Sequence, residues 1–146
     1  MKRHEALAPL SREHHSALIL AQLLKNITTV YTGLPADVIG KAAYAIRFYN
    51  EELIKHFKEE EDIVIATITG IDAALDTLAI EIIAEHKELQ TLFTTINDVN
   101  DLSAHLEKIG NTLEQHIRKE ERIFFPLVQQ LCNQAQLAAI EKALSV

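Results

Sequence analysis

The stretch "HIRKEERIFFP", residues 116–126, places charged residues inside an otherwise apolar helical pattern. His116 falls on the stripe that joins Leu113 to Ile123, because successive residues of a helix are about 100° apart. Glu120 lies one turn further along, on nearly the same face. A charge run on a helix is usually a solvated face. A His and a Glu that point toward the core therefore need a chemical reason.

The same arrangement occurs sixty residues earlier, in "HFKEEEDIVIA" at residues 56–66. There His56 corresponds to His116, and Glu60 corresponds to Glu120. "AEHKEL", residues 84–89, adds His86 to a third apolar stripe. The chain thus has two H-x3-E pairs and a further inward His, and it resembles two similar helical hairpins.

The first helical stretch, "REHHSAL" at residues 12–18, contains two adjacent histidines. Positions 3, 4, 7 and 10 after an inward residue should be apolar. They are Ala, Leu, Ala and Leu when counted from His14, but Leu, Ile, Gln and Lys when counted from His15. We therefore predict that His14 faces the core and that His15 leans toward solvent.

The apolar periodicity predicts an all-α, up-down-up-down four-helix bundle made by one domain over residues 1–146. Turn residues and capping residues divide the chain. Pro126 should kink or break the last long helix, since it removes a backbone donor. The expected segments run from a cap at Ser11 to near Gly33, from a cap at Asp37 to about Ile68, from Asp72 to near Ile96, from near Ser103 through Leu131, and from about Gln134 to Leu144 in a short fifth helix.

Composition narrows the class of protein. The 146 residues are 48% hydrophobic and only 5% aromatic, which favours a helical globule. The net charge of −7, without a basic block, makes nucleic acid and anionic membranes poor partners. The single cysteine, Cys132, excludes an internal disulfide and a thiolate metal cage. No signal peptide or membrane span is visible, so we expect a cytoplasmic protein.

Metal binding explains polar residues on every apolar stripe. A buried Glu costs several kcal/mol unless it is paired or bound to metal, and no matching buried Lys or Arg is evident. Imidazole and carboxylate suit iron, manganese or zinc. Four His and two Glu can serve two ions, two His on each, with both carboxylates bridging and open positions for a small molecule such as O2 or NO. The expected metal ligands are His14, His56, Glu60, His86, His116 and Glu120.

Two simpler interpretations compete with a metal site. A single His on a helix stripe is more often a hydrogen-bonded core residue than a ligand, and a cluster such as "KEEED" at residues 58–62 is usually solvated. The chain could then be a metal-free interaction bundle with a polar core. The joint pattern favours metal, because four helices each place a His inward and the two H-x3-E pairs occupy equivalent frames.

Four stretches together resemble the hemerythrin-like (HHE cation-binding) family: "LSREHHSALILA", "HFKEEEDIVIA", "AEHKELQTLF" and "HIRKEERIFFPLV". The resemblance covers nearly the whole chain. It implies a four-helix bundle that holds two non-haem iron ions, Fe2+ or Fe3+, joined by an oxo or hydroxo bridge, with manganese or zinc as substitutes. Carried over by position, the four histidines are terminal ligands, and Glu60 and Glu120 are the bridging carboxylates.

The chain departs from the oxygen-carrying hemerythrins at two positions. Gln90 stands where they have a second His on the third helix, and their fourth-helix carboxylate falls at the position of Glu121. The four-His, two-Glu set is more similar to bacterial hemerythrin-like proteins and to the repair-of-iron-centres family, whose usual cysteine-containing N-terminal segment we do not expect in this protein. Two roles therefore remain open for Glu121: it supports the metal ligands from outside the ligand set, or it binds the metal itself.

Two functions follow as hypotheses. The first is a non-haem di-iron protein that binds or senses O2 or NO, or holds iron. The alternative is a di-iron redox enzyme or repair-type protein that acts on peroxide, NO or damaged iron–sulfur sites, motivated by the missing fifth His and by Tyr49 on the face of His56. We expect His105, about 16 Å along the helix from His116, to lie outside the centre. His4 should sit in a flexible end, and Cys132 should serve packing.

Overall fold

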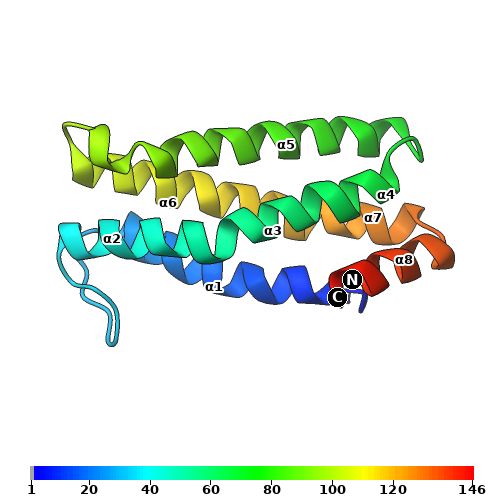
Figure 1. Ribbon diagram of the computed structural model, residues 1–146, viewed down its shortest axis with the longest axis horizontal. Helices are drawn as coiled ribbons and strands as arrows, with labels where there is room; N and C mark the ends of the chain where they lie inside the picture. The colour runs from blue at the N-terminus through cyan, green and yellow to red at the C-terminus, as the bar shows by residue number, and fades with distance from the viewer. Residues whose placement is uncertain (1) are drawn as a thin grey trace.

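The computed structural model describes residues 2–146, and its long segments run alternately up and down as a four-helix bundle (Figure 1). This confirms the all-α fold and the short fifth helix. The first and third segments are single helices, whereas the second and fourth contain π-helical turns. In chain order the elements are α1 (Ala8–Lys25), α2 (Val38–Phe48), η1 (Tyr49–Leu53), α3 (Ile54–Glu59), η2 (Glu60–Ile65), α4 (Ala66–Ile68), α5 (Ala73–Thr94), η3 (Ile96–Asp98), α6 (Leu102–Lys119), η4 (Glu120–Phe124), α7 (Phe125–Leu131) and α8 (Gln134–Leu144).

Aspartate side chains begin three of the long segments. Asp37 accepts from the backbone N–H of Gly40, and Asp72 and Asp101 cap α5 and α6 in the same way. The prediction for the first helix was wrong at both ends. α1 begins at Ala8 with Pro9 in its first turn, where the missing N–H costs nothing, and it ends at Lys25.

A buried lysine closes the end of α1. Lys41 is fully buried, and its ammonium donates to the carbonyls of Asn26, Ile27 and Thr29 at 2.9–3.1 Å. These carbonyls lie just beyond the last turn of α1, and that of Asn26 also accepts from the backbone N–H of Thr29. The Lys41 ammonium therefore stabilises the turn that follows α1, in which the chain leaves the helix before Gly33.

The π-helical turns change the register of the buried face. Ile123 was expected in the core, but its side chain is 53% exposed, and Phe124 is fully buried in its place. A π-helical turn holds more residues than an α-helical turn, so counting by the α-helical period fails by one residue after Glu120. Pro126 does not end the helix, because it lies in the first turn of α7 directly after η4.

The apolar core is divided into two clusters by a polar layer. One cluster includes Leu20, Leu89 and Leu113, and the other includes Leu10, Ile82, Phe124 and the α8 residue Ile140. The inward histidines fall between these clusters along their helices, as His14 does between Leu10 and Ala17. The polar layer thus crosses the middle of the bundle and is shielded on both sides.

Gly110 brings α1 and α6 close together. A Cβ atom at this position would lie 2.7 Å from the carbonyl oxygen of Ala21 and 2.8 Å from the backbone nitrogen of Lys25. Real side chains do not tolerate such distances to backbone atoms. The absence of a side chain at Gly110 therefore sets the spacing of the two helices that present His14 and His116.

Candidate metal centre

Six buried side chains meet in the polar layer. They form two groups of four whose ligand atoms lie within 4.8 Å of one another, and both groups share Glu60 and Glu120. One group adds His14 and His56, and the other adds His86 and His116. Each of the six is at most 3% exposed. The structure therefore brings together all six residues expected from the sequence.

The two groups are arranged alike. The Nε2 atom of His14 lies 3.0 Å from Glu120 Oε1, and that of His86 lies 3.0 Å from Glu60 Oε1. Within the H-x3-E pairs, the Nε2 to carboxylate distance is 3.3 Å for both His56–Glu60 and His116–Glu120. The two halves of the bundle, α1 to η2 and α5 to η4, therefore contribute equivalent contacts with equal distances, so they are related by an approximate two-fold symmetry.

Most of the inward polar atoms have no hydrogen-bond partner. These atoms are the Nε2 atoms of His14, His56 and His116, the Oε2 atom of Glu60, and both carboxylate oxygens of Glu120. Buried polar groups are nearly always paired, so such a convergence is typical of a site that can hold a metal ion. Imidazole nitrogens and carboxylate oxygens suit iron, manganese or zinc, and the donor set fits two metal ions.

A second carboxylate holds the outer side of each imidazole. Each His Nδ1 lies 2.7 Å from a glutamate oxygen, and the Nδ1–H donates to that carboxylate. Imidazoles that bind metals usually donate their other ring N–H in this manner, which turns the free Nε2 lone pair toward the ion. The four pairs are His14–Glu121, His56–Glu13, His86–Glu61 and His116–Glu85.

The outer roles of Glu13, Glu61 and Glu85 were not predicted from the sequence. Glu13 and Glu85 each precede an inward His, in the repeated "EH" dipeptide, but each bonds the His of the following long helix. Glu121 was left open between two roles. It lies outside both four-residue groups and accepts from His14 Nδ1 instead.

The π-helical turns aim adjacent glutamates at different targets. η2 begins at Glu60, and η4 begins at Glu120. At both places the first Glu enters the centre, and the second reaches the outer nitrogen of a His on a neighbouring helix. Isolated π-helical turns are frequent at functional sites, because they redirect one side chain without ending the helix.

The hemerythrin HHE cation-binding domain is the family whose sequence model matches this chain, over residues 4–128. The chain belongs to this family. Its matched range includes every residue of the two four-residue groups and the four outer glutamates. No curated protein and no solved structure matches the chain. Among residues 2–146, no helix of this HHE chain is both long and apolar enough to cross a membrane.

Imidazoles and carboxylates of the HHE centre shift each other's pKa values, so that both are charged when no metal is bound. Burial lowers the pKa of His56, but the charge of Glu60 close to Nε2 and the hydrogen bond to Glu13 outweigh it and raise the pKa to about 9. For His116 the charge of Glu120 and the hydrogen bond to Glu85 likewise overcome burial, so the pKa rises to about 10. Burial favours the neutral form of Glu60, yet the neighbouring imidazoles hold its pKa well below the usual range. The imidazolium protons thus balance the buried carboxylates.

The remaining candidates lie outside this centre. His15 is exposed, as predicted. His105 bonds the carbonyl of Leu92 at the end of α5, at 2.7 Å, and Cys132 is buried among apolar residues. The prediction for His4 was wrong: its carbonyl and its ring accept from the backbone at the start of α1. Gln90, at the position of a fifth His, is exposed.

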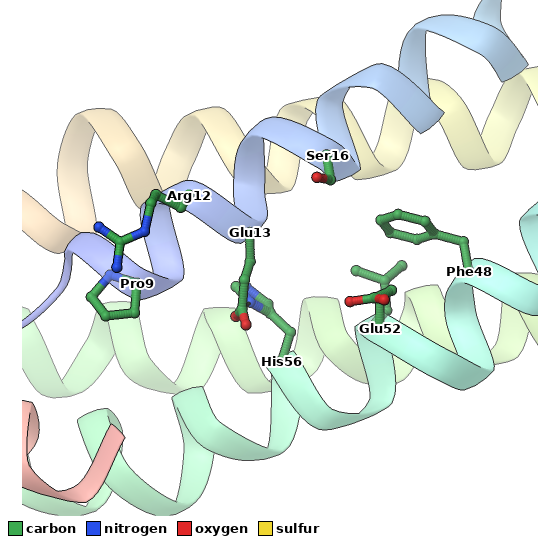
Figure 2. Close-up of a pocket in the computed structure, with 8 residues that line it drawn as sticks. Pro9, Arg12, Glu13, Ser16, Phe48, Glu52 and His56 are labelled. Carbon is green, nitrogen blue, oxygen red and sulfur yellow. Dashed lines mark hydrogen bonds and ion pairs between the residues drawn. The ribbon is translucent and has the colours of Figure 1, made fainter. Parts of the chain in front are cut away.

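Surface hollows reach the outer edge of the HHE centre. One of about 330 Å³ lies between α1 and the η1–α3 segment, and its lining includes Arg12, Phe48 and Glu52. Figure 2 shows Glu13 extending from α1 to the His56 ring across this hollow. Another, of about 300 Å³, is lined by Tyr49, Gln90 and His86 among others. Tyr49 itself stacks on Phe93, at 4.9 Å between ring centroids, rather than on a ligand ring.

Proposed function

We propose that this HHE domain holds two iron ions in its polar layer and binds a small molecule such as O2 or NO there. In this assignment His14 and His56 bind one ion, and His86 and His116 bind the other. Glu60 and Glu120 bridge the two ions. The observation that carries the proposal is the convergence of six buried side chains, most of whose inward atoms lack a hydrogen-bond partner. Manganese or zinc would substitute, because the same donor types suit them.

The protein side of the site supplies orientation and shielding. The four outer glutamates hold the imidazoles with Nε2 inward, and the two apolar clusters exclude bulk water from the layer. Iron, when bound, would supply coordination positions for a small ligand in addition to those that the six protein side chains fill. The second group has two imidazoles, because the residue at position 90 is an exposed Gln rather than a third His.

Metal analysis tests the proposal directly. The protein is purified without oxygen, loaded with Fe2+ and desalted, and iron per chain is measured. We expect two ions per chain for the parent and for the His15→Ala control, whose altered residue is exposed beside the ligand His14. Less than one iron per chain in the parent would exclude the di-iron centre and leave the metal-free bundle as the better account.

The redox-enzyme alternative is favoured by one observation, the hollow that brings solvent to the outer edge of His86 beside Gln90. Turnover of peroxide and of NO by the iron-loaded protein separates this function from binding alone. If His56→Ala abolishes the turnover rate, the enzyme hypothesis is supported. A rate that the substitution leaves unchanged would exclude catalysis at this centre.

We also propose that residues 1–146 form one domain. The helix α8 begins after the matched range ends at residue 128. Leu137 and Ile140 of α8 nevertheless belong to the same apolar cluster as Phe124 and Val128. Deletion of residues 133–146 should therefore lower the melting temperature of the metal-loaded protein, and an unchanged melt would place α8 outside the domain.

A further inference from the structure

The side chain of Arg3 makes a set of contacts at the edge of the centre that metal binding by the six ligands does not explain. Its guanidinium donates from Nη2 to the carbonyl of Glu121 at 2.6 Å and to Glu121 Oε1 at 3.3 Å, and from Nη1 to Gln129 Oε1 at 3.0 Å. It also lies over the ring of Phe125, with 5.4 Å from Cζ to the ring centroid. The side chain is only 18% exposed.

Both Glu121 and Phe125 contact the inward residue His14. Glu121 Oε2 accepts from His14 Nδ1 at 2.7 Å and from the hydroxyl of Ser11 at 2.7 Å. Phe125 stacks on the His14 ring, at 5.5 Å between centroids and 12° between planes. Arg3 therefore bonds the carboxylate on the edge of the His14 ring and covers the aromatic ring on its face.

Residues 2–7 are held in place to present this guanidinium. The side chain of Gln129 accepts from the backbone N–H of His4 at 2.9 Å and donates to the carbonyl of Lys2 at 3.0 Å. Ala6 and Leu7 are fully buried. The segment is thus fixed to α7 on one side of Arg3 and packed into the core on the other.

The second half of the centre has its own cation. Lys119 Nζ donates to Glu85 Oε2 at 2.8 Å, and Glu85 Oε1 accepts from His116 Nδ1 at 2.7 Å. Within residues 2–146, the other outer carboxylates, Glu13 and Glu61, form ion pairs only with their imidazoles. Each four-residue group thus contains one imidazole that is backed by a carboxylate and a cation in series, through Arg3 in one group and Lys119 in the other.

We propose that Arg3 is a positioning residue for His14, through Glu121 and Phe125, and that residues 2–7 thereby support the His14/His56 metal position selectively. Lys119 plays the matching part for the His86/His116 position through Glu85. The physical reason is that a cation bonded to the far oxygen fixes the position of the carboxylate, which in turn fixes the imidazole with Nε2 inward. This inference rests on the proposed function, because it assumes that both positions bind an ion.

The test uses Co2+, whose visible absorption depends on its ligands, added without oxygen to the full chain. Removing an outer partner of a metal-binding imidazole typically weakens metal affinity 10- to 100-fold. Arg3 lies one bond further out, so its loss should lower the affinity for one of the two ions about 10-fold. In the Arg3→Met variant the other ion should keep its affinity. Arg3→Lys should restore part of the loss, because an ammonium also bonds a carboxylate.

Two backgrounds identify the ion that is affected. The His86→Ala variant retains the His14/His56 position. In this background, adding Arg3→Met should lower the affinity for the remaining ion, and adding Lys119→Met should not. In His14→Ala the two effects should exchange. Arg118→Met, which removes a charge that pairs with Glu114 on the exposed face of α6, controls for net charge.

The proposal would be overturned if Arg3→Met lowered the Co2+ affinity of both positions equally, or lowered neither. If the parent itself takes up no Co2+ and no Fe2+, the proposed function fails. Arg3 is then tested in the metal-free protein by the 15N chemical shifts of the histidine rings. Arg3→Met should shift the His14 ring signals and leave those of His86 and His116 in place, and unchanged His14 signals would overturn the positioning role as well.

Discussion

The Nδ1 atom of His56 lies 2.7 Å from Oε1 of Glu13, which comes from a different helix. The opposite nitrogen of the same ring lies 3.3 Å from Glu60 Oε2 in the centre of the bundle. His116 repeats this arrangement between Glu85 and Glu120, with the same two distances. Each ring is therefore held from outside by a half-buried carboxylate and directed at a carboxylate that both halves share.

Shared carboxylates should matter more than single imidazoles. Because Glu120 belongs to both four-residue groups, Glu120→Ala should lower the affinity for both ions, whereas His14→Ala should lower it for one. Iron per chain, measured after loading at limiting free Fe2+, should fall from two toward zero in the first variant and toward one in the second. Equal stoichiometry in the two variants would contradict a bridging role for Glu120.

Metal should stabilise the fold, because the ligands come together only in the native state. At a free ion concentration 100-fold above the dissociation constant, binding adds about 2.7 kcal/mol to the free energy of unfolding. The melting temperature of the parent, followed by circular dichroism, should rise with Fe2+ under anaerobic conditions and fall again with a chelator. His15→Ala should respond like the parent, and a parent melt that ignores iron would argue against a site in the core.

The metal-free protein should lose stability at alkaline pH. The pKa values of His56 and His116 rise to about 9 and about 10 in the folded state, from an ordinary value of 6.5. The folded state therefore binds more protons, and the stabilisation is fully present below pH 6.5 and is lost as the pH rises through 9 to 10.

Urea unfolding of chelator-treated protein measures this loss. The midpoint should be lower at pH 10 than at pH 7, and the difference should shrink in His56→Ala. At acid pH the sign reverses, because the depressed pKa of Glu60 stabilises the fold above 4.5 and this contribution is lost as the pH falls further. A midpoint that increases between pH 7 and pH 10 would contradict the charge balance inferred for the centre.

The buried ammonium of Lys41 should contribute strongly to stability. Lys41→Met keeps most of the buried volume but removes the ammonium from three carbonyls, of which, within residues 2–146, only that of Asn26 keeps another donor, the backbone N–H of Thr29. Removing one partner of a buried charged hydrogen-bond set costs about 3 kcal/mol or more. Lys25→Met is the matched control, since it removes a half-exposed pair with Glu114 that is worth about 1 kcal/mol or less. Urea unfolding should separate the two variants, and equal midpoints would contradict this account.

Close packing at Gly110 gives a prediction with an unusual sign. A Gly to Ala change inside an exposed helix normally stabilises by about 1 kcal/mol. Here the added methyl meets backbone atoms of α1 at 2.7 and 2.8 Å, so Gly110→Ala should instead destabilise by about 1–3 kcal/mol. Asn111→Ala, at the exposed neighbouring position of α6, should not destabilise to this degree. A stabilised Gly110→Ala variant would show that α1 and α6 can separate at little cost.

The sequence by itself determined the helical class, the caps at Asp37 and Asp72, and the six inward residues, because all of these depend on local periodicity and local hydrogen bonds. Its motifs also sufficed to indicate the family. The choice of His14 over His15 followed from the same period, since burial on a helix repeats every three to four residues.

Only the tertiary structure decided which atoms bond across helices. Counting by the α-helical period placed Ile123 in the core, because nothing local reveals the π-helical turns that bury Phe124 instead. The outer glutamates, the Lys41 ammonium and the Arg3 guanidinium all bond partners on other segments, from 12 to 126 residues away. These contacts depend on how whole helices are placed side by side, and the pattern of one helix does not contain that information.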